Sequence, residues 1–183
     1  MKIIVDAMGG DNAPQATVRG ALQAIKELGA EVILVGRGEE ILETLHADGI
    51  AELPAGLEIT HADQVVEMCD NPATAFKEKK DSSLTVGLNL LKEGVGDAFV
   101  SAGSTGALLS AATLLVKRVK GIRRAALAPV VPTGKGGAVL IDCGATAECT
   151  PEFLLQFAFM GSYYAERVLG RPEPKVGLLN IGA

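Results

Sequence analysis

Tryptophan is absent from this 183-residue chain, and the other aromatic residues are only two tyrosines and five phenylalanines. Hydrophobic residues still make up 48% of the chain, so a core must be built mainly from Ala, Leu, Val and Ile. Charged residues make up 21%, which is ordinary for a globular protein. The length is enough to bury a sizeable core, and we expect residues 1–183 to form a single α/β domain.

Cysteine is scarce as well. The three cysteines are an odd number and form no Cys-x-x-Cys pair, so neither a disulfide framework nor a zinc site is predicted. We expect three buried or half-buried thiols in a reducing cytosol. The two histidines stand alone, and no metal or cofactor is expected.

Long apolar runs and a basic charge balance are also missing. No segment reaches about 18 uninterrupted apolar residues, so no transmembrane helix is predicted. The apolar run near the N-terminus is too short for a signal peptide, and Asp6 interrupts it. The net charge of −5 argues against a general nucleic-acid-binding protein. These observations together predict a cytoplasmic protein.

Short apolar segments alternate with segments of helical periodicity along the whole chain. The expected strands are 2–7, 31–36, 57–62, 97–102, 136–145 and 175–182. The expected helices are 14–29, 39–47, two pieces within 70–94, 104–118 and 151–168. Such alternation predicts a three-layer Rossmann-like α/β fold with a mostly parallel sheet. The Pro- and Gly-rich stretch 129–137 is expected to be a mobile loop.

Small, polar, Gly-rich loops follow several of these strands. They are residues 6–12, 101–106 and 142–146, with Asn180 and Gly182 after the last strand. Ligands of open parallel sheets bind outside the carboxyl ends of the strands. The repetition of such loops at one edge therefore points to a binding site there.

The loop 101–106 has two interpretations. Its glycines allow a ligand close to the backbone, and a helix that begins near Ser104 would direct unpaired N–H groups at an anion such as phosphate. The alternative is a tight strand-to-helix turn with an ordinary cap. No phosphate-binding G-x-x-x-x-G-K-[ST] loop and no dinucleotide-binding G-x-G-x-x-G motif is present.

Three carboxylates, those of Asp6, Asp11 and Asp142, lie at or just beyond strand ends. They are the candidate catalytic groups, as bases or as ligands. Their commonest use at such positions is to cap turns and helices.

The segment 116–124 contains a basic run. Its members are Lys117, Arg118, Lys120, Arg123 and Arg124. The run fits either a helix C-terminus, which favours positive charge, or a docking patch for an acidic partner. The preceding helix, 104–118, is apolar almost all round and is expected to be buried on both sides.

The loops occur in a known combination and order. The segments "VDAMGGDNAP", "SAGSTGA", "KGIRRAALAPVVPT", "DCGA" with "PEFLLQFA", and "VGLLNIGA" resemble the bacterial fatty acyl-carrier-protein:phosphate acyltransferase family along essentially the whole chain. Two departures are Ser104 and Thr146, where the family usually has Asn.

The resemblance implies transfer of a fatty acyl group from acyl carrier protein to inorganic phosphate, giving acyl phosphate for phospholipid synthesis. It implies a fold similar to phosphate acetyltransferases and the isocitrate dehydrogenase group, and this chain as the N-terminal portion of a longer enzyme. A homodimer and peripheral association with the membrane are further expectations. The open alternatives are a nucleotide- or dinucleotide-binding enzyme of the same fold, or an inactive fragment.

The expected site combines the loop residues with the family's chemistry. Phosphate or the thioester carbonyl would contact Gly103, Ser104, Thr105 and Gly106. The neighbouring wall would be shaped by Asp6, Gly9, Gly10 and Asp11. Opposite them we expect Asp142 and Gly144. Further residues expected to bind phosphate or substrate are Gly9, Gly10, Gly144 and Asn180. The basic run would dock the acidic carrier protein.

Overall fold

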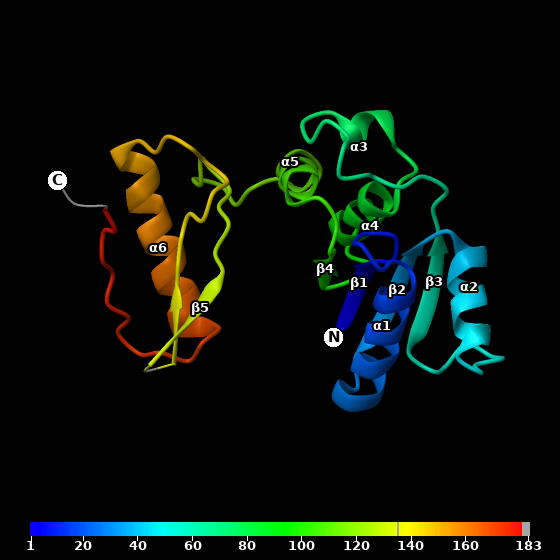
Figure 1. Ribbon diagram of the computed structural model, residues 1–183. Coiled ribbons are helices and arrows are strands. Elements are labelled where there is room, and N and C mark those ends of the chain that lie inside the picture. The colour runs from blue at the N-terminus through cyan, green and yellow to red at the C-terminus, as the bar shows by residue number, and fades with distance from the viewer. Residues whose placement is uncertain (135, 181–183) are drawn as a thin grey trace. The chain divides into compact units, whose positions relative to one another are not determined.

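The computed structural model describes residues 1–134 and 136–180 (Figure 1). Contacts within the chain divide it into two compact units, Met1–Lys117 and Arg118–Ala183.

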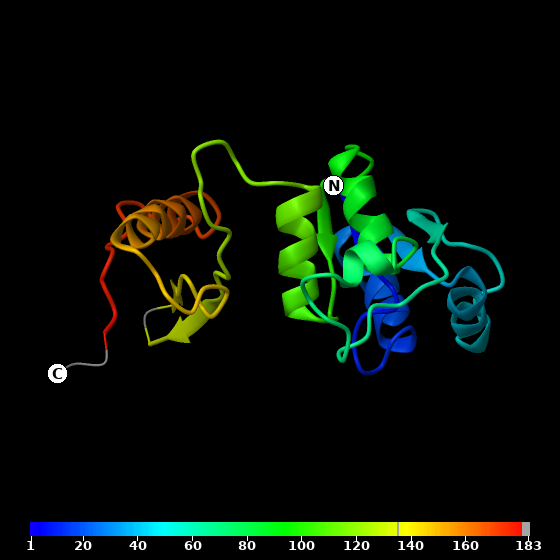
Figure 2. The ribbon, with the colours of Figure 1, turned by 90° about the horizontal axis from the view of Figure 1, so that it is seen from above.

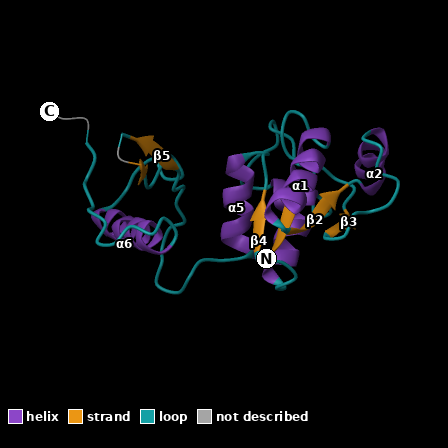
Figure 3. Ribbon diagram, turned by 90° about the horizontal axis from the view of Figure 1, so that it is seen from below, coloured by secondary structure: helices purple, strands orange, loops and turns teal. Residues whose placement is uncertain are grey.

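The first unit is an α/β layer structure. Its elements are β1 (Lys2–Asp6), α1 (Gln15–Leu28), β2 (Glu31–Gly36), α2 (Gly38–Ala47), β3 (Leu57–His61), α3 (Ala75–Glu78), α4 (Ser83–Lys92), β4 (Ala98–Val100) and α5 (Thr105–Leu115). The four strands are parallel, in the order β3-β2-β1-β4 (Figure 3). The expected parallel sheet is therefore confirmed for this unit.

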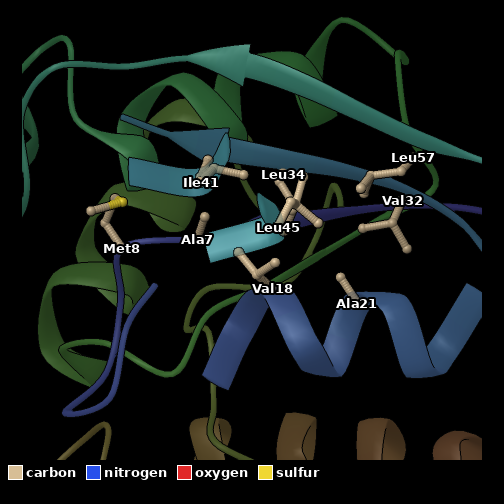
Figure 4. Close-up of a cluster of buried hydrophobic side chains, with 9 residues drawn as sticks. All are labelled: Ala7, Met8, Val18, Ala21, Val32, Leu34, Ile41, Leu45 and Leu57. Carbon is tan, nitrogen blue, oxygen red and sulfur yellow. The ribbon is translucent and has the colours of Figure 1, made fainter. Parts of the chain in front are cut away.

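Helices cover both faces of the sheet. Along β2, Val32 and Leu34 pack with α1 and α2, while Ile33 and Val35 face the side of α4. Side chains alternate between the two faces of a strand, so a continuous apolar run is what a doubly covered parallel strand requires. Figure 4 shows the cluster on the first face. The three expected layers are present.

Local signals set the limits of α1 and α4. Gly29 ends α1 in the left-handed region, at φ 62°, where glycine carries no Cβ penalty. Ser82 begins α4, and its hydroxyl accepts the Thr85 N–H at 3.3 Å. Both limits follow from the sequence.

Helix α5 is shorter and less buried than expected. It spans Thr105–Leu115, and its buried residues, Ala107 and Ala111, pack on the α3–α4 side. Leu114 on another face is 55% exposed. Within the first unit the helix is therefore covered on one side only, and the expectation of burial on both sides is not met there.

The second unit contains β5 (Val130–Thr133), β6 (Gly136–Val139) and α6 (Pro151–Arg167). The strands form an antiparallel hairpin with Thr133 paired to Gly136, and α6 contacts β6 (Figure 2). Thr150 caps α6, accepting the Phe153 N–H at 3.4 Å. The prediction of a mobile loop over 129–137 is therefore wrong for the described residues of that range, because cross-strand hydrogen bonds order them.

Two expected strands of the second unit also differ. The strand expected over 136–145 ends at Val139, beyond which the chain turns around Asp142. Among the described residues, 175–180 form no strand. The end of that expected strand, 181–182, lies outside the described residues.

The cysteines are free thiols, and their burial differs from expectation. Cys69 and Cys143 are exposed, and Cys149 is half-buried. All three lie in loops, where no core is available to cover them.

Candidate functional site

Two loops of the first unit begin side by side at the carboxyl edge of the sheet. Strands β1 and β4 are parallel neighbours, and Val5 pairs with Val100. The β1–α1 loop (residues 7–14) and the β4–α5 loop (residues 101–104) therefore leave the sheet from adjacent positions. This is the edge at which the sequence predicts a binding site.

A buried carboxylate joins the two loops. Asp6 is only 3% exposed, and its Oδ2 accepts the Ser101 hydroxyl at 2.7 Å. Its Oδ1 accepts the Met8 N–H at 3.2 Å. Ser101 Oγ in turn accepts the Gly103 N–H at 3.1 Å. Both oxygens of Asp6 are thus engaged in holding the loops.

Glycines let these loops pack against each other. A Cβ on Gly9 would lie 2.5 Å from Asp6 Oδ2 and 2.9 Å from Ser101 Oγ, closer than real Cβ atoms approach. Gly10 has a φ of +113°, and its Cβ would lie 3.1 Å from that of Ala102. A Cβ on Gly103 would lie 3.4 Å from the Gly9 Cα. The structure brings Asp6, Gly9, Gly10 and Gly103 together.

The N-terminus of α5 follows directly. Ser104 is buried and caps the helix, its hydroxyl accepting the Ala107 N–H at 3.4 Å. In the part of the chain that the structure describes, the N–H groups of Thr105 and Gly106 have no acceptor. Thr105 is exposed, and the positive end of the helix dipole adds to these two donors. This end of α5 can therefore hold an anion.

Gly106 also has a packing role that sequence reasoning missed. A Cβ there would lie 3.0 Å from the Pro72 Cβ, so the loop before α3 lies against the first turn of α5. Ser101 was missed as a site residue as well. Its signal was its position, since it follows β4 just as Ala7 and Met8 follow β1.

The other carboxylates play different parts. Asp11 is exposed in the β1–α1 loop. Asp142 accepts the Leu127 N–H at 2.8 Å and the Thr146 N–H at 2.7 Å, and so anchors a turn, the commonest use of such a residue.

Three expected site residues belong to the second unit. They are Asp142, Gly144 and Asn180. Gly144 is exposed at a φ of +107°, and Asn180 is exposed in the loop after α6. Their expected roles in the site stay predictions.

The basic run is a loop rather than a helix end, because α5 stops at Leu115. Arg123 Nη1 lies 2.8 Å from Glu152 Oε2, and the Arg123 N–H donates to Gln156 Oε1 at 2.9 Å. The Arg124 guanidinium lies 5.6 Å from the centre of the Phe153 ring. The helix-end interpretation is therefore confined to Lys117, which directly follows the C-cap Val116 and donates its N–H to the Ala112 carbonyl at 3.0 Å. Two arginines tie the rest of the loop to α6.

No group of three or more His, Cys, Asp and Glu side chains within residues 1–134 and 136–180 could hold a metal ion. Among the same residues, no helix has both the length and the apolar character needed to cross a bilayer.

Comparisons with known proteins show the family and the fold. A family model described as "Fatty acid synthesis protein" matches residues 1–183. Two relatives named phosphate acyltransferase come from Desulforamulus reducens, 50% identical over 183 residues, and Desulfitobacterium hafniense strain DCB-2, 54% identical over 182. Each match covers 100% of this chain and 54% of the relative. The chain thus spans about half the length of these relatives.

A solved structure shares the fold. It is a phosphotransacetylase from Streptococcus pyogenes, with a TM-score of 0.67 and 21% sequence identity. The match covers 93% of this chain and 55% of that one. The expected similarity to phosphate acetyltransferases is therefore confirmed for the fold.

Proposed function

Because this chain belongs to the fatty acid synthesis protein family, we propose that it transfers a fatty acyl group from acyl carrier protein to inorganic phosphate. Relatives about half identical to it are named phosphate acyltransferase. The observation that carries the proposal is the open N-terminus of α5 beside the loops joined by Asp6 and Ser101. It offers the donors that a phosphate needs at the edge where a parallel sheet binds ligands.

The reaction exchanges a C–S bond for a C–O bond. A phosphate oxygen attacks the thioester carbonyl carbon, and the carrier protein's sulfur leaves with the electrons of the C–S bond. The proton of hydrogen phosphate goes to that sulfur, so the products are acyl phosphate and the free thiol. Phosphate itself is the nucleophile, so no side chain has to attack the thioester. The protein has mainly to position phosphate and to stabilise the oxyanion that forms at the thioester carbonyl.

Backbone donors at α5 suit both tasks. The N–H groups of Thr105 and Gly106 point out of the helix start, and the Thr105 hydroxyl adds a third donor. The geometry argues against Asp6 as a base, since both of its oxygens accept bonds from the protein and Gly9 covers it. Asp6 supports the loops instead.

We also propose a docking surface, a homodimer, a location, and roles for three residues of the second unit. Lys117, Arg118 and Lys120 are exposed, and we assign them the docking of the acidic carrier protein. Homodimer formation, cytoplasmic location and peripheral membrane association are carried by the family resemblance. So are the roles of Asp142, Gly144 and Asn180.

Direct detection of acyl phosphate tests the proposal. The purified protein is incubated with palmitoyl-acyl carrier protein and inorganic phosphate, and acyl phosphate is trapped with hydroxylamine as the hydroxamate. Trapped product is expected to rise with phosphate concentration above the slow background that the thioester itself gives when phosphate is omitted. Thioester loss that is independent of phosphate would contradict the proposal and point to a hydrolase.

A further inference from the structure

We propose that Ser101 is a positioning residue of the phosphate site, which acts together with Asp6 by fixing the turn that leads into α5. The inference rests on the proposed function, because it concerns how that site is held. Ser101 itself is not expected to contact phosphate. The expected contacts belong to residues 103–106, which follow it in the same loop.

The first step is the anchoring of Asp6. Asp6 is buried, at 3% exposure, and one of its carboxylate oxygens accepts the Met8 N–H while the other accepts the Ser101 hydroxyl. The 2.7 Å Ser101–Asp6 bond links residues 95 positions apart. Asp6 ends β1 and Ser101 directly follows β4, and these two strands are neighbours in the sheet. Hydrogen bonds to a carboxylate are among the stronger ones, and burial strengthens them further.

The second step is the direction of the bonds. A carboxylate only accepts, so the single proton of Ser101 is directed at Asp6 Oδ2. The lone pairs of Ser101 Oγ are then free to accept the Gly103 N–H. The chain of bonds runs one way, from the Gly103 N–H through Ser101 to Asp6.

The third step concerns the backbone of the loop. The Gly103 N–H is turned inward to Ser101, so it is already used and is not offered to a ligand. Ser104 then caps the Ala107 N–H. The first open donors are therefore those of Thr105 and Gly106, and their direction depends on the turn that Ser101 holds.

The fourth step is the packing of Gly9 over the pair. The close approach of the Gly9 backbone to Asp6 Oδ2 and Ser101 Oγ leaves no room for a side chain. The network is shielded, and a lost bond would leave a buried acceptor without its partner. Through its bonds to Asp6 and to the Gly103 N–H, Ser101 thus holds the start of α5 in a defined position relative to β1.

Phosphate affinity and amide exchange test this inference in the chain 1–183. Inorganic phosphate is titrated and followed by NMR at the Thr105 and Gly106 amides, and the hydrogen exchange of Gly103 is recorded. Ser101→Ala is expected to weaken phosphate binding about tenfold and to speed exchange at Gly103. Ser101→Thr, which keeps the hydroxyl, is expected to restore both. Ser110→Ala, the same change in the middle of α5, is the matched control and is expected to change neither.

The outcomes separate this inference from the proposed function. If the wild-type chain binds no phosphate at these amides, the phosphate site at α5 and the inference fall together. If wild type and Ser101→Ala bind phosphate equally, with equal Gly103 exchange, the inference alone is overturned. It is also overturned if Ser101→Thr loses as much affinity as Ser101→Ala. Should Ser101→Ala not fold, Ser101→Cys keeps the volume with a weak donor and must show the same loss.

Discussion

At the scale of single residues, the carboxyl edge of the sheet depends on two short polar side chains and on a glycine that has no side chain. Asp6 and Ser101 form the bond that joins the two loops. Gly9 has no Cβ where one would lie 2.5 Å from Asp6 Oδ2. Small residues here are a packing requirement in the protein itself, apart from any contact with a ligand.

Gly9→Ala tests that requirement. The added methyl group must displace Asp6 or Ser101, so we expect a loss of about 1–3 kcal/mol in the free energy of unfolding, measured by urea denaturation. Gly20→Ala is the control, since nothing lies within 4 Å of a Cβ at that position of α1. It is expected to stabilise the protein by about 0.5–1 kcal/mol, because alanine is the better helix former. Equal effects of the two changes would refute the packing argument.

At the scale of elements, the loop before α3 is held by an ion pair. Lys79 Nζ lies 2.5 Å from Asp70 Oδ2 and also donates to the Val65 carbonyl at 2.8 Å. The pKa of Asp70 is held below its ordinary value, first by the bond from Lys79 and then by the Glu67 N–H. This loop carries Pro72, which lies against the first turn of α5. The ion pair thus supports one side of the candidate site.

The pH dependence of this element follows from the direction of the shift. A carboxyl group whose pKa is lowered by folding adds stability above its unfolded pKa, about 3.9 for Asp, and loses it as the pH falls through the lower folded value. Lys79→Met is expected to raise the pKa of Asp70 toward its ordinary value, as measured by ¹³C NMR titration. The control is Lys80→Met, since Lys80 makes no ion pair among the described residues. An Asp70 pKa that Lys79→Met leaves unchanged would show that the Glu67 N–H alone sets it.

At the scale of the whole molecule, a chain of net charge −5 carries a dense basic run in which Lys117 ends the first unit and the other four residues belong to the second. Arg123 is bound to Glu152 and Gln156, and Arg124 lies over Phe153. Reversing these two charges would disturb α6 as well as any docking. Lys117 and Lys120 are exposed, and they allow the docking proposal to be tested by itself.

We expect Lys117→Glu with Lys120→Glu to raise the KM for acyl carrier protein several-fold and to weaken its dependence on salt. The KM for inorganic phosphate is expected to stay as in wild type, because the phosphate donors belong to α5. Steady-state kinetics over a range of ionic strength make the measurement. Lys26→Glu with Lys92→Glu, at two exposed lysines of α1 and α4, is the control of equal charge change. Unchanged carrier-protein kinetics in the double variant would remove these lysines from the docking surface.

The sequence by itself determined three features of the first unit. They are the succession of strands along the chain, the helices that cover the sheet, and the Gly-rich loops at one edge of it. These depend on signals within a few residues: the apolar run of β2, the stop at Gly29, and the caps at Ser82, Ser104 and Thr150. The family resemblance also rests on such short segments.

Tertiary structure alone decided what Asp6 does, where α5 ends and which Pro- and Gly-rich segment becomes a hairpin. Asp6 accepts a hydrogen bond from Ser101, 95 residues away, and no pattern near Asp6 in the sequence indicates that bond. The stretch 130–133 is ordered through its pairing with β6, whereas 175–180 forms no strand among the described residues. Strand pairing and buried hydrogen bonds join residues far apart in the chain, so no local pattern contains them. A strand exists only where a neighbour accepts its hydrogen bonds.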